Sequence, residues 1–142
     1  MKKKIITGLI VLVLFLLWIY AVYIDVFPKA EKFNYPDFSS VESITVSQDD
    51  EAINLNQEDC KMLYEYIRVA KPTREKSVNE TPYVTPFYTV VIKSDDISHF
   101  GYGYIYEEQR TTYFEIPYVG VYTLDSDVLK YIKKQPESCG VK

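Results

Sequence analysis

The chain has 142 residues, 16 Lys and Arg, 20 Asp and Glu, and a formal net charge of −4 at pH 7. That length suits one domain plus a short additional segment. All acidic residues lie at or beyond Asp25, whereas three of the basic residues precede it, so the chain from Asp25 onward carries a net charge near −7. This acidity disfavours nucleic acid as a partner, because phosphate binding needs a basic face. It also disfavours close docking on anionic lipid, although local basic patches can still act.

The N-terminal segment is long and apolar. Ile5 to Ile24 carries no charge, and 14 of its 20 residues are Leu, Ile, Val or Phe. A helix of this length spans about 30 Å, the thickness of a bilayer core. Trp18, Tyr20 and Tyr23 would form an aromatic belt at one end, and the three lysines at positions 2–4 place the N-terminus in the cytoplasm. We predict an uncleaved, single-pass signal anchor in a cell membrane, with the rest of the chain outside.

The alternative is a cleaved secretory signal peptide. Its apolar stretch is usually 7–15 residues long and ends in small residues, whereas this run is longer and ends in bulky side chains. The sequence Pro28-Lys29-Ala30 is a poor cleavage site. No cysteine directly follows the apolar run, which excludes a lipid-modified N-terminal cysteine, and the run contains no GxxxG pattern that would favour a helix dimer.

The first half of the remaining chain predicts a hairpin and a helix. Alternation over 41–46 predicts a strand, and a turn at 48–51 leads to a second strand through Ile53 and Leu55. Asn56 is a suitable N-cap, and apolar residues at helical spacing continue to about Ala70, with Pro72 beyond. A polar connection follows.

The second half predicts an antiparallel meander and a short helix. Three strands are expected, over 88–92, 99–107 and 112–116, and the third continues over 121–124 after an interruption at Pro117. Asp125 is expected to cap a last helix with an apolar stripe at Val128, Leu129 and Ile132. The order β-β-α-β-β-β-α with short connections predicts an α+β two-layer domain, mostly antiparallel sheet with two helices. The expected organisation is a cytoplasmic tail (1–4), a transmembrane helix (5–24), a juxtamembrane spacer (25–40), an extracytoplasmic domain (41–135) and a C-terminal tail (136–142).

An aromatic stripe is the most suggestive candidate site. Four aromatic residues share one face of the predicted 99–107 strand, namely Phe100, Tyr102, Tyr104 and Tyr106. They form either a binding platform for a sugar ring or a peptide, or one wall of the core. We favour core, because Gly101 and Gly103 thin the opposite face.

Cys60 and Cys139 are the two cysteines, and outside the cytoplasm they favour a disulfide over two unpaired thiols. Neither has metal-ligand spacing to a histidine. His99, the single histidine, has no evident catalytic partner in the sequence.

The remaining motifs favour turns. The acidic runs at 49–51 and 95–96 lack EF-hand spacing and are expected to be hairpin turns. Pro117, Tyr118 and Gly120 mark a β-turn or bulge, or alternatively a functional loop. The sequence predicts no catalytic, cofactor-binding or metal-binding residue.

Three segments carry a resemblance. They are Lys71-Pro72-Thr73, Ser77-Val78-Asn79-Glu80-Thr81-Pro82 and Glu115-Ile116-Pro117-Tyr118-Val119-Gly120-Val121-Tyr122. The region from about Val41 to Ile132 resembles a family of small, uncharacterised secreted or membrane-anchored domains from Gram-positive bacteria, many of them lipoproteins. This chain departs from that pattern by keeping a spanning helix. The resemblance implies location and fold, and it supplies no functional residues.

The functional expectation is a membrane-anchored, extracytoplasmic binding or sensing module without catalytic activity. Its partner is an unknown protein or envelope ligand. Two alternatives are an accessory subunit of another membrane protein complex and an enzyme of the cell envelope.

Overall fold

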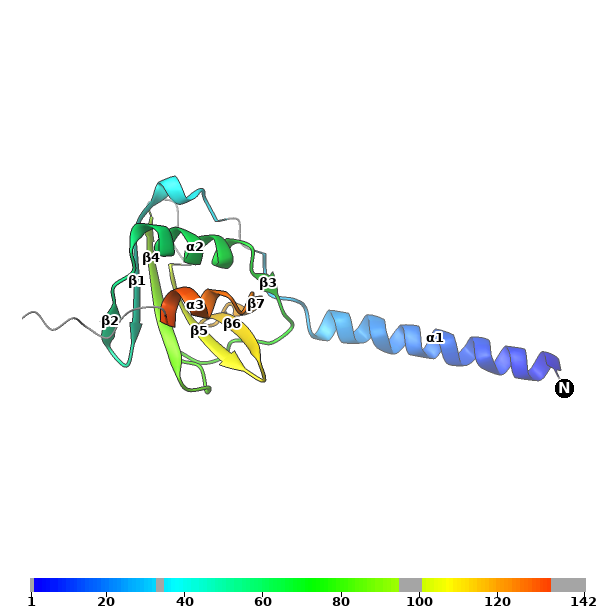
Figure 1. The fold of residues 1–142 in the computed structure, drawn as a ribbon. Coiled ribbons are helices and arrows are strands. Elements are labelled where there is room, and N and C mark those ends of the chain that lie inside the picture. Colours follow the sequence, from blue (N-terminus) through cyan, green and yellow to red (C-terminus); the bar gives the residue numbers. More distant parts are fainter. Residues whose placement is uncertain (1, 33–34, 95–100, 134–142) are drawn as a thin grey trace, which may run out of the picture.

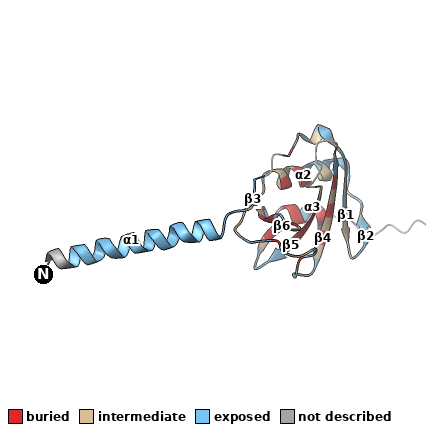
Figure 2. Ribbon diagram, turned by 180° about the vertical axis from the view of Figure 1, so that it is seen from behind, coloured by how far each residue is buried: buried red, intermediate tan, exposed pale blue. Residues whose placement is uncertain are grey.

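A long helix precedes a single folded domain in the computed structural model, which describes residues 2–32, 35–94 and 101–133. Helix α1 (Lys2–Val26) projects away from the domain (Figure 1) and is exposed from Ile5 onward (Figure 2). Its segment from Ile5 to Val26 is long and apolar enough to cross a membrane, a property that signal sequences share. The predicted N-terminal helix is therefore confirmed.

The domain is built on a seven-stranded sheet in the order β2-β1-β4-β5-β6-β7-β3. Every neighbouring pair is antiparallel. The strands are β1 (Val41–Gln48), β2 (Glu51–Ile53), β3 (Lys71–Pro72), β4 (Phe87–Ser94), β5 (Tyr102–Glu108), β6 (Thr111–Ile116) and β7 (Gly120–Leu124). The predicted α+β class is confirmed. Strand β3 was not predicted, because two residues are too few to show a periodicity. The prediction of one interrupted strand over 112–124 was wrong, because the chain reverses in a turn after Ile116 and β6 and β7 pair antiparallel.

Two hairpins turn through left-handed backbone at both central residues. Asp49 and Asp50 have φ of 49° and 66°, and Gln109 and Arg110 have φ of 50° and 67°. Two-residue turns of this kind match the right-handed twist of the flanking strands. Asp adopts this conformation readily, whereas Gln and Arg do so only under constraint from the strands that they join.

Two helices cover one face of the sheet (Figure 1). Helix α2 (Gln57–Arg68) begins at the predicted cap, where the Asn56 side chain accepts a hydrogen bond of 2.8 Å from the Asp59 N–H. Helix α3 (Val128–Lys133) buries the predicted apolar stripe of Val128, Leu129 and Ile132. The helices meet where the rings of Tyr66 and Tyr131 lie 5.8 Å apart.

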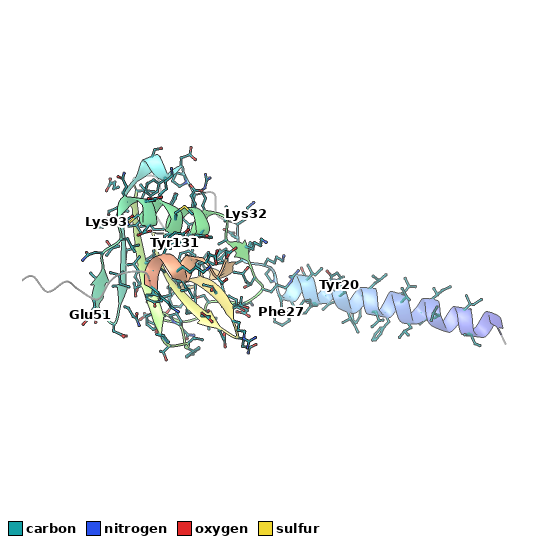
Figure 3. All side chains as sticks on the ribbon, in the orientation of Figure 1. Tyr20, Phe27, Lys32, Glu51, Lys93 and Tyr131 are labelled. Atoms are coloured by element: carbon teal, nitrogen blue, oxygen red, sulfur yellow. The ribbon has the colours of Figure 1, made fainter. Side chains whose placement is uncertain are left out.

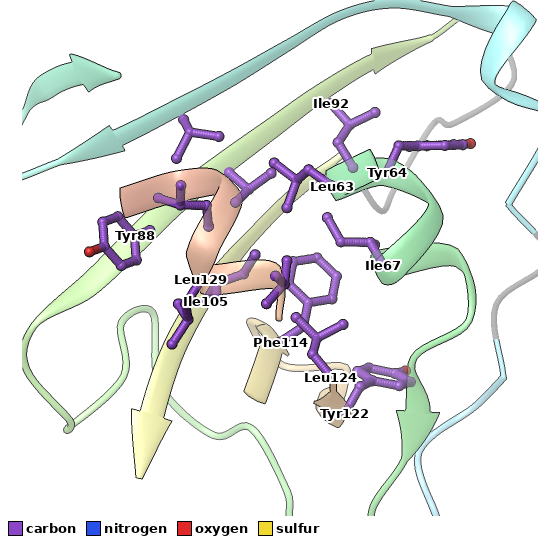
Figure 4. Packing of buried hydrophobic residues seen from close by; sticks show 14 of the residues in the cluster. Leu63, Tyr64, Ile67, Tyr88, Ile92, Ile105, Phe114, Tyr122, Leu124 and Leu129 are labelled. Carbon is purple, nitrogen blue, oxygen red and sulfur yellow. The ribbon is translucent and has the colours of Figure 1, made fainter. Parts of the chain in front are cut away.

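The main core lies between these helices and the sheet, where Leu63 and Ile67 of α2 face Ile105 and Phe114 (Figure 4). Gly103 belongs to this face, and a Cβ placed there would lie 2.6 Å from Phe114 Cε2. The Phe114 ring thus fills the space that glycine leaves. Our expectation that the glycine-thinned face of β5 would bury little was wrong, because a neighbouring strand supplies the missing volume.

The aromatic stripe lies on the sheet face opposite the helices, and only part of it is buried. Tyr104 and Tyr106 are buried, at 3% and 5% exposure, whereas Tyr102 is 45% exposed. Phe100 lies outside the described residues. The connection between β3 and β4 supplies cover for this face, since Ser77 from that connection bonds to β6. The stripe is therefore a secondary core that opens toward solvent at Tyr102.

The segment expected to be a spacer packs against the domain. The Ala30 N–H donates to the Thr73 carbonyl at 2.9 Å, and the Tyr122 hydroxyl donates to the Glu31 carbonyl at 2.8 Å. The Tyr35 side chain is buried in the core. The chain leaving α1 thus runs along the outer edge of the sheet.

Candidate functional site

A pocket of about 450 Å³ opens where the stripe reaches the surface. It lies on the sheet face opposite the helices, between β5, the end of β6 and the β3–β4 connection. Its lining residues are Glu80, Thr81, Tyr102, Tyr104, Ile116 and Pro117.

The aromatic side of the pocket is a fixed stack. The rings of Tyr102 and Tyr104 lie 5.3 Å apart at 74°, and their hydroxyl oxygens are 2.6 Å apart. Phe87 holds Tyr104 from behind, with ring centroids 5.1 Å apart at 79°. Edge-to-face packing of this kind is favourable beyond the buried area alone. Tyr104 is therefore locked, and it positions the half-exposed ring of Tyr102.

A buried carboxylate ties the covering connection to the sheet. Glu115 of β6 is buried, accepts a hydrogen bond of 2.7 Å from Ser77 Oγ, and is hydrogen-bonded to the Tyr106 side chain. Ser77 Oγ in turn accepts a bond of 3.2 Å from the Tyr118 N–H. A buried carboxylate needs such partners. Through these bonds, Glu115 holds the β3–β4 connection, which forms one wall of the pocket, against β6.

The buried tyrosines stay neutral. Burial raises the pKa of Tyr104, and its hydrogen bond to Tyr102 adds to the effect. Burial also raises the pKa of Tyr106, with a further contribution from the negative charge of Glu115. A protonated hydroxyl both donates and accepts hydrogen bonds, but it is a poor base or nucleophile. The pocket therefore offers aromatic surface, neutral hydroxyls and the exposed carboxylate of Glu80.

The predicted loop at 117–120 borders this pocket. Pro117 lines it, and Val119 N–H donates to the Ile116 carbonyl at 3.0 Å to close the turn. Tyr118 has a φ of 62° and is exposed. Gly120 has no room for a side chain, because a Cβ would overlap Ala30. The turn thus joins the pocket rim to the segment leaving α1.

Cys60 lies away from the pocket. Cys60 is half-buried on α2, and burial raises the pKa of its thiol. Cys139 and His99 lie outside the described residues, so the disulfide stays a prediction. Within the described ranges, no group of three His, Cys, Asp or Glu side chains is arranged to hold a metal ion.

Sequence reasoning missed the polar half of the pocket. Glu80 and Thr81 come from an irregular connection whose position no periodicity indicates. Glu115 gave a usable signal, since it is a single carboxylate within the otherwise aromatic and apolar run from Tyr113 to Ile116.

The fold and the pocket define a small α+β domain carried behind a helix of membrane-spanning length. The chain belongs to the family DUF5301, described as Domain of unknown function (DUF5300), which matches residues 29–123. The predicted membership of an uncharacterised family is thereby confirmed. The match includes every residue lining the pocket and leaves out α1 and α3. No curated protein and no solved structure matches the chain.

Proposed function

We propose that this protein is a membrane-anchored, extracytoplasmic binding module without catalytic activity, and that its pocket holds a neutral, hydroxyl-rich ligand such as a sugar ring. The observation that carries the proposal is the half-exposed Tyr102 ring, fixed by Tyr104 at the wall of a pocket of about 450 Å³. Ligand pockets commonly combine such an apolar surface with a few well-placed polar groups.

The polar groups support this ligand class. Glu80 is an exposed acceptor, and Thr81 and the two tyrosine hydroxyls both donate and accept. An anionic ligand would meet the charge of Glu80 with no basic side chain among the lining residues. A sugar ring offers an apolar face for Tyr102 and hydroxyls for the polar groups.

The anchor part of the proposal rests on α1 and its flanks. The apolar segment of α1 is preceded by three lysines, and Trp18, Tyr20 and Tyr23 lie near its other end. This pattern favours a cytoplasmic N-terminus and a domain on the outer side.

The non-catalytic part rests on how the titratable groups are used. Glu115 is engaged by Ser77 and Tyr106, and burial keeps Tyr104 protonated. Glu80 is then the single free carboxylate among the lining residues, whereas glycoside hydrolysis generally uses a pair of carboxyl groups.

The test is titration of the full chain, in lipid nanodiscs, with a neutral N-acetylglucosamine oligosaccharide. Tyr102→Ala is expected to weaken binding by about tenfold, the equivalent of about 1.4 kcal/mol, because the stacking surface is removed. Tyr83→Ala is the matched control, since this tyrosine is 86% exposed on the same connection and does not line the pocket.

Equal affinity in the wild type and Tyr102→Ala, or no binding of the oligosaccharide, would contradict the proposed ligand. Mass spectrometry of the recovered oligosaccharide tests the alternative that the protein is an enzyme. Shortened products that require the protein would replace the binding module with a cell-envelope enzyme.

A further inference from the structure

Basic residues gather in two short segments of an otherwise acidic domain. Residues 27–32 and 71–76 together contain five basic and two acidic side chains. The chain from Asp25 onward has 13 basic and 20 acidic residues, so its remainder is strongly acidic. The five basic residues are Lys29, Lys32, Lys71, Arg74 and Lys76.

The fold brings these two segments together beside the end of α1. The Ala30 N–H donates to the Thr73 carbonyl at 2.9 Å. The Arg74 guanidinium donates to the Phe27 carbonyl and lies 5.6 Å from the centre of the Tyr23 ring. Figure 3 shows Phe27 and Lys32 on the side of the domain that faces α1. The basic segments thus occupy the membrane-facing end of the domain.

A hollow of about 300 Å³ lies on this end, between the two segments and the turn that follows β6. Lys29 and Lys76 line it together with the carboxylates of Glu31 and Glu75. Three exposed apolar or aromatic side chains, those of Val78, Tyr118 and Val119, complete this part of the lining. Basic side chains beside exposed apolar and aromatic ones are typical of surfaces that bind at the headgroup layer.

We propose that this membrane-proximal face binds the phosphate headgroup of an anionic phospholipid. Lys29 and Lys76 pair with the phosphate, while Val78, Tyr118 and Val119 enter the headgroup layer. The five basic and two acidic side chains of the two segments leave this end of the domain with an excess of positive charge, although Glu31 and Glu75 balance the two lysines inside the hollow itself. Continuity with α1 also supports this partner, because a domain held by Arg74 at the helix end presents this face to the bilayer. The inference rests on the anchor in the proposed function, and it is independent of the ligand in the Tyr102 pocket.

The experiment uses the full chain in nanodiscs of equal parts phosphatidylglycerol and phosphatidylcholine. A benzoylphenylalanine photocrosslinker replaces the exposed Tyr118 ring, and mass spectrometry identifies the captured lipid. A second crosslinker at Glu51, at the opposite end of the domain (Figure 3), is the positional control. Quenching of the single tryptophan, Trp18, by brominated lipid chains separately reports insertion of α1.

The crosslinker at position 118 is expected to capture phosphatidylglycerol about fivefold over phosphatidylcholine or more, since each lysine near an anionic surface contributes a factor of about five. Lys29→Glu with Lys76→Glu should reduce this ratio to near one. Lys61→Glu with Lys93→Glu makes the same change in net charge on exposed residues of α2 and β4 and should leave the ratio unchanged. The crosslinker at position 51 should capture no lipid.

Quenched Trp18 with no lipid preference at position 118, or a preference that the first double variant retains, overturns the docking face and leaves the anchor standing. Unquenched Trp18 overturns the anchor in the proposed function, and the docking face with it.

Discussion

The hydroxyl of Thr112 is buried in the core and, within the described part of the chain, has no hydrogen-bond partner. The hydroxyl of Thr73 is the opposite case, because it donates to the Val121 carbonyl at 2.7 Å and accepts from the Glu75 N–H at 3.1 Å. An unpartnered buried hydroxyl costs free energy, whereas a bonded one contributes to stability. The two threonines therefore respond oppositely to the same substitution.

Thr112→Val is expected to raise the free energy of unfolding by about 1 kcal/mol, because valine keeps the shape and removes the unpaired oxygen. Thr73→Val is expected to lower it by about 1 kcal/mol. Urea unfolding of the full chain in detergent micelles measures both. A destabilising Thr112→Val would show that the hydroxyl has a partner.

The buried tyrosines give the domain an alkaline limit. The pKa of both Tyr104 and Tyr106 lies above the ordinary value of 10.0 in the folded state. The unfolded chain then releases these protons first as the pH rises. The contribution of the two tyrosines to the free energy of unfolding is fully present below about pH 10. It falls above that pH, by up to about 1.4 kcal/mol per pH unit for each tyrosine. Unfolding free energies between about pH 8 and about pH 11 should fall less steeply in Tyr104→Phe than in the exposed control Tyr83→Phe. Parallel curves for the two variants would argue against this account.

At the scale of the element, β5 shows what a sequence pattern predicts and what it leaves open. Period-two alternation correctly separated Tyr104 and Tyr106 from Ile105. It could not show that Phe114 fills the space over Gly103, since that contact depends on the register between β5 and β6. The two helices, the antiparallel order and the Asn56 cap were predictable because local signals specify them.

The pocket was predictable only in part. Tyr102 and Tyr104 were candidates from the stripe, and Pro117 was one from the turn after β6. Glu80 and Thr81 reach the pocket through an irregular connection that bonds through Ser77 to Glu115. Ser77 and Glu115 are 38 residues apart, and a hydrogen bond between residues so distant leaves no pattern that a single sequence could show.

Tyr104→Ala should separate the buried from the exposed half of the stripe. Removing the buried ring is expected to lower the free energy of unfolding by about 3–5 kcal/mol, in the range for large aromatic truncations. Tyr102→Ala, on a ring that is 45% exposed, should cost about 1 kcal/mol or less. Thermal unfolding of both full-length variants measures the difference. A Tyr104→Ala protein as stable as Tyr102→Ala would mean that this face is not a core.

At the scale of the whole molecule, the expected orientation is open to a direct test. Alkaline phosphatase fused after Lys142 should be active, and a green fluorescent protein fused there through the same export route should be dark, if the domain has the proposed position outside the cytoplasm. Replacing the three lysines at positions 2–4 with glutamate should reduce the phosphatase signal, since these charges set the orientation. A fluorescent fusion with inactive phosphatase would contradict the predicted topology.

The two outer strands of the sheet have a consequence for aggregation. Exposed strand edges recruit other strands and lead to aggregation, so natural sheets often have very short or covered edge strands. Here β2 has three residues and β3 has two, and the segment leaving α1 bonds through Ala30 just beyond β3. The segment that follows α1 thus covers the β3 edge of the sheet, which leaves little open backbone there for strand addition by another chain.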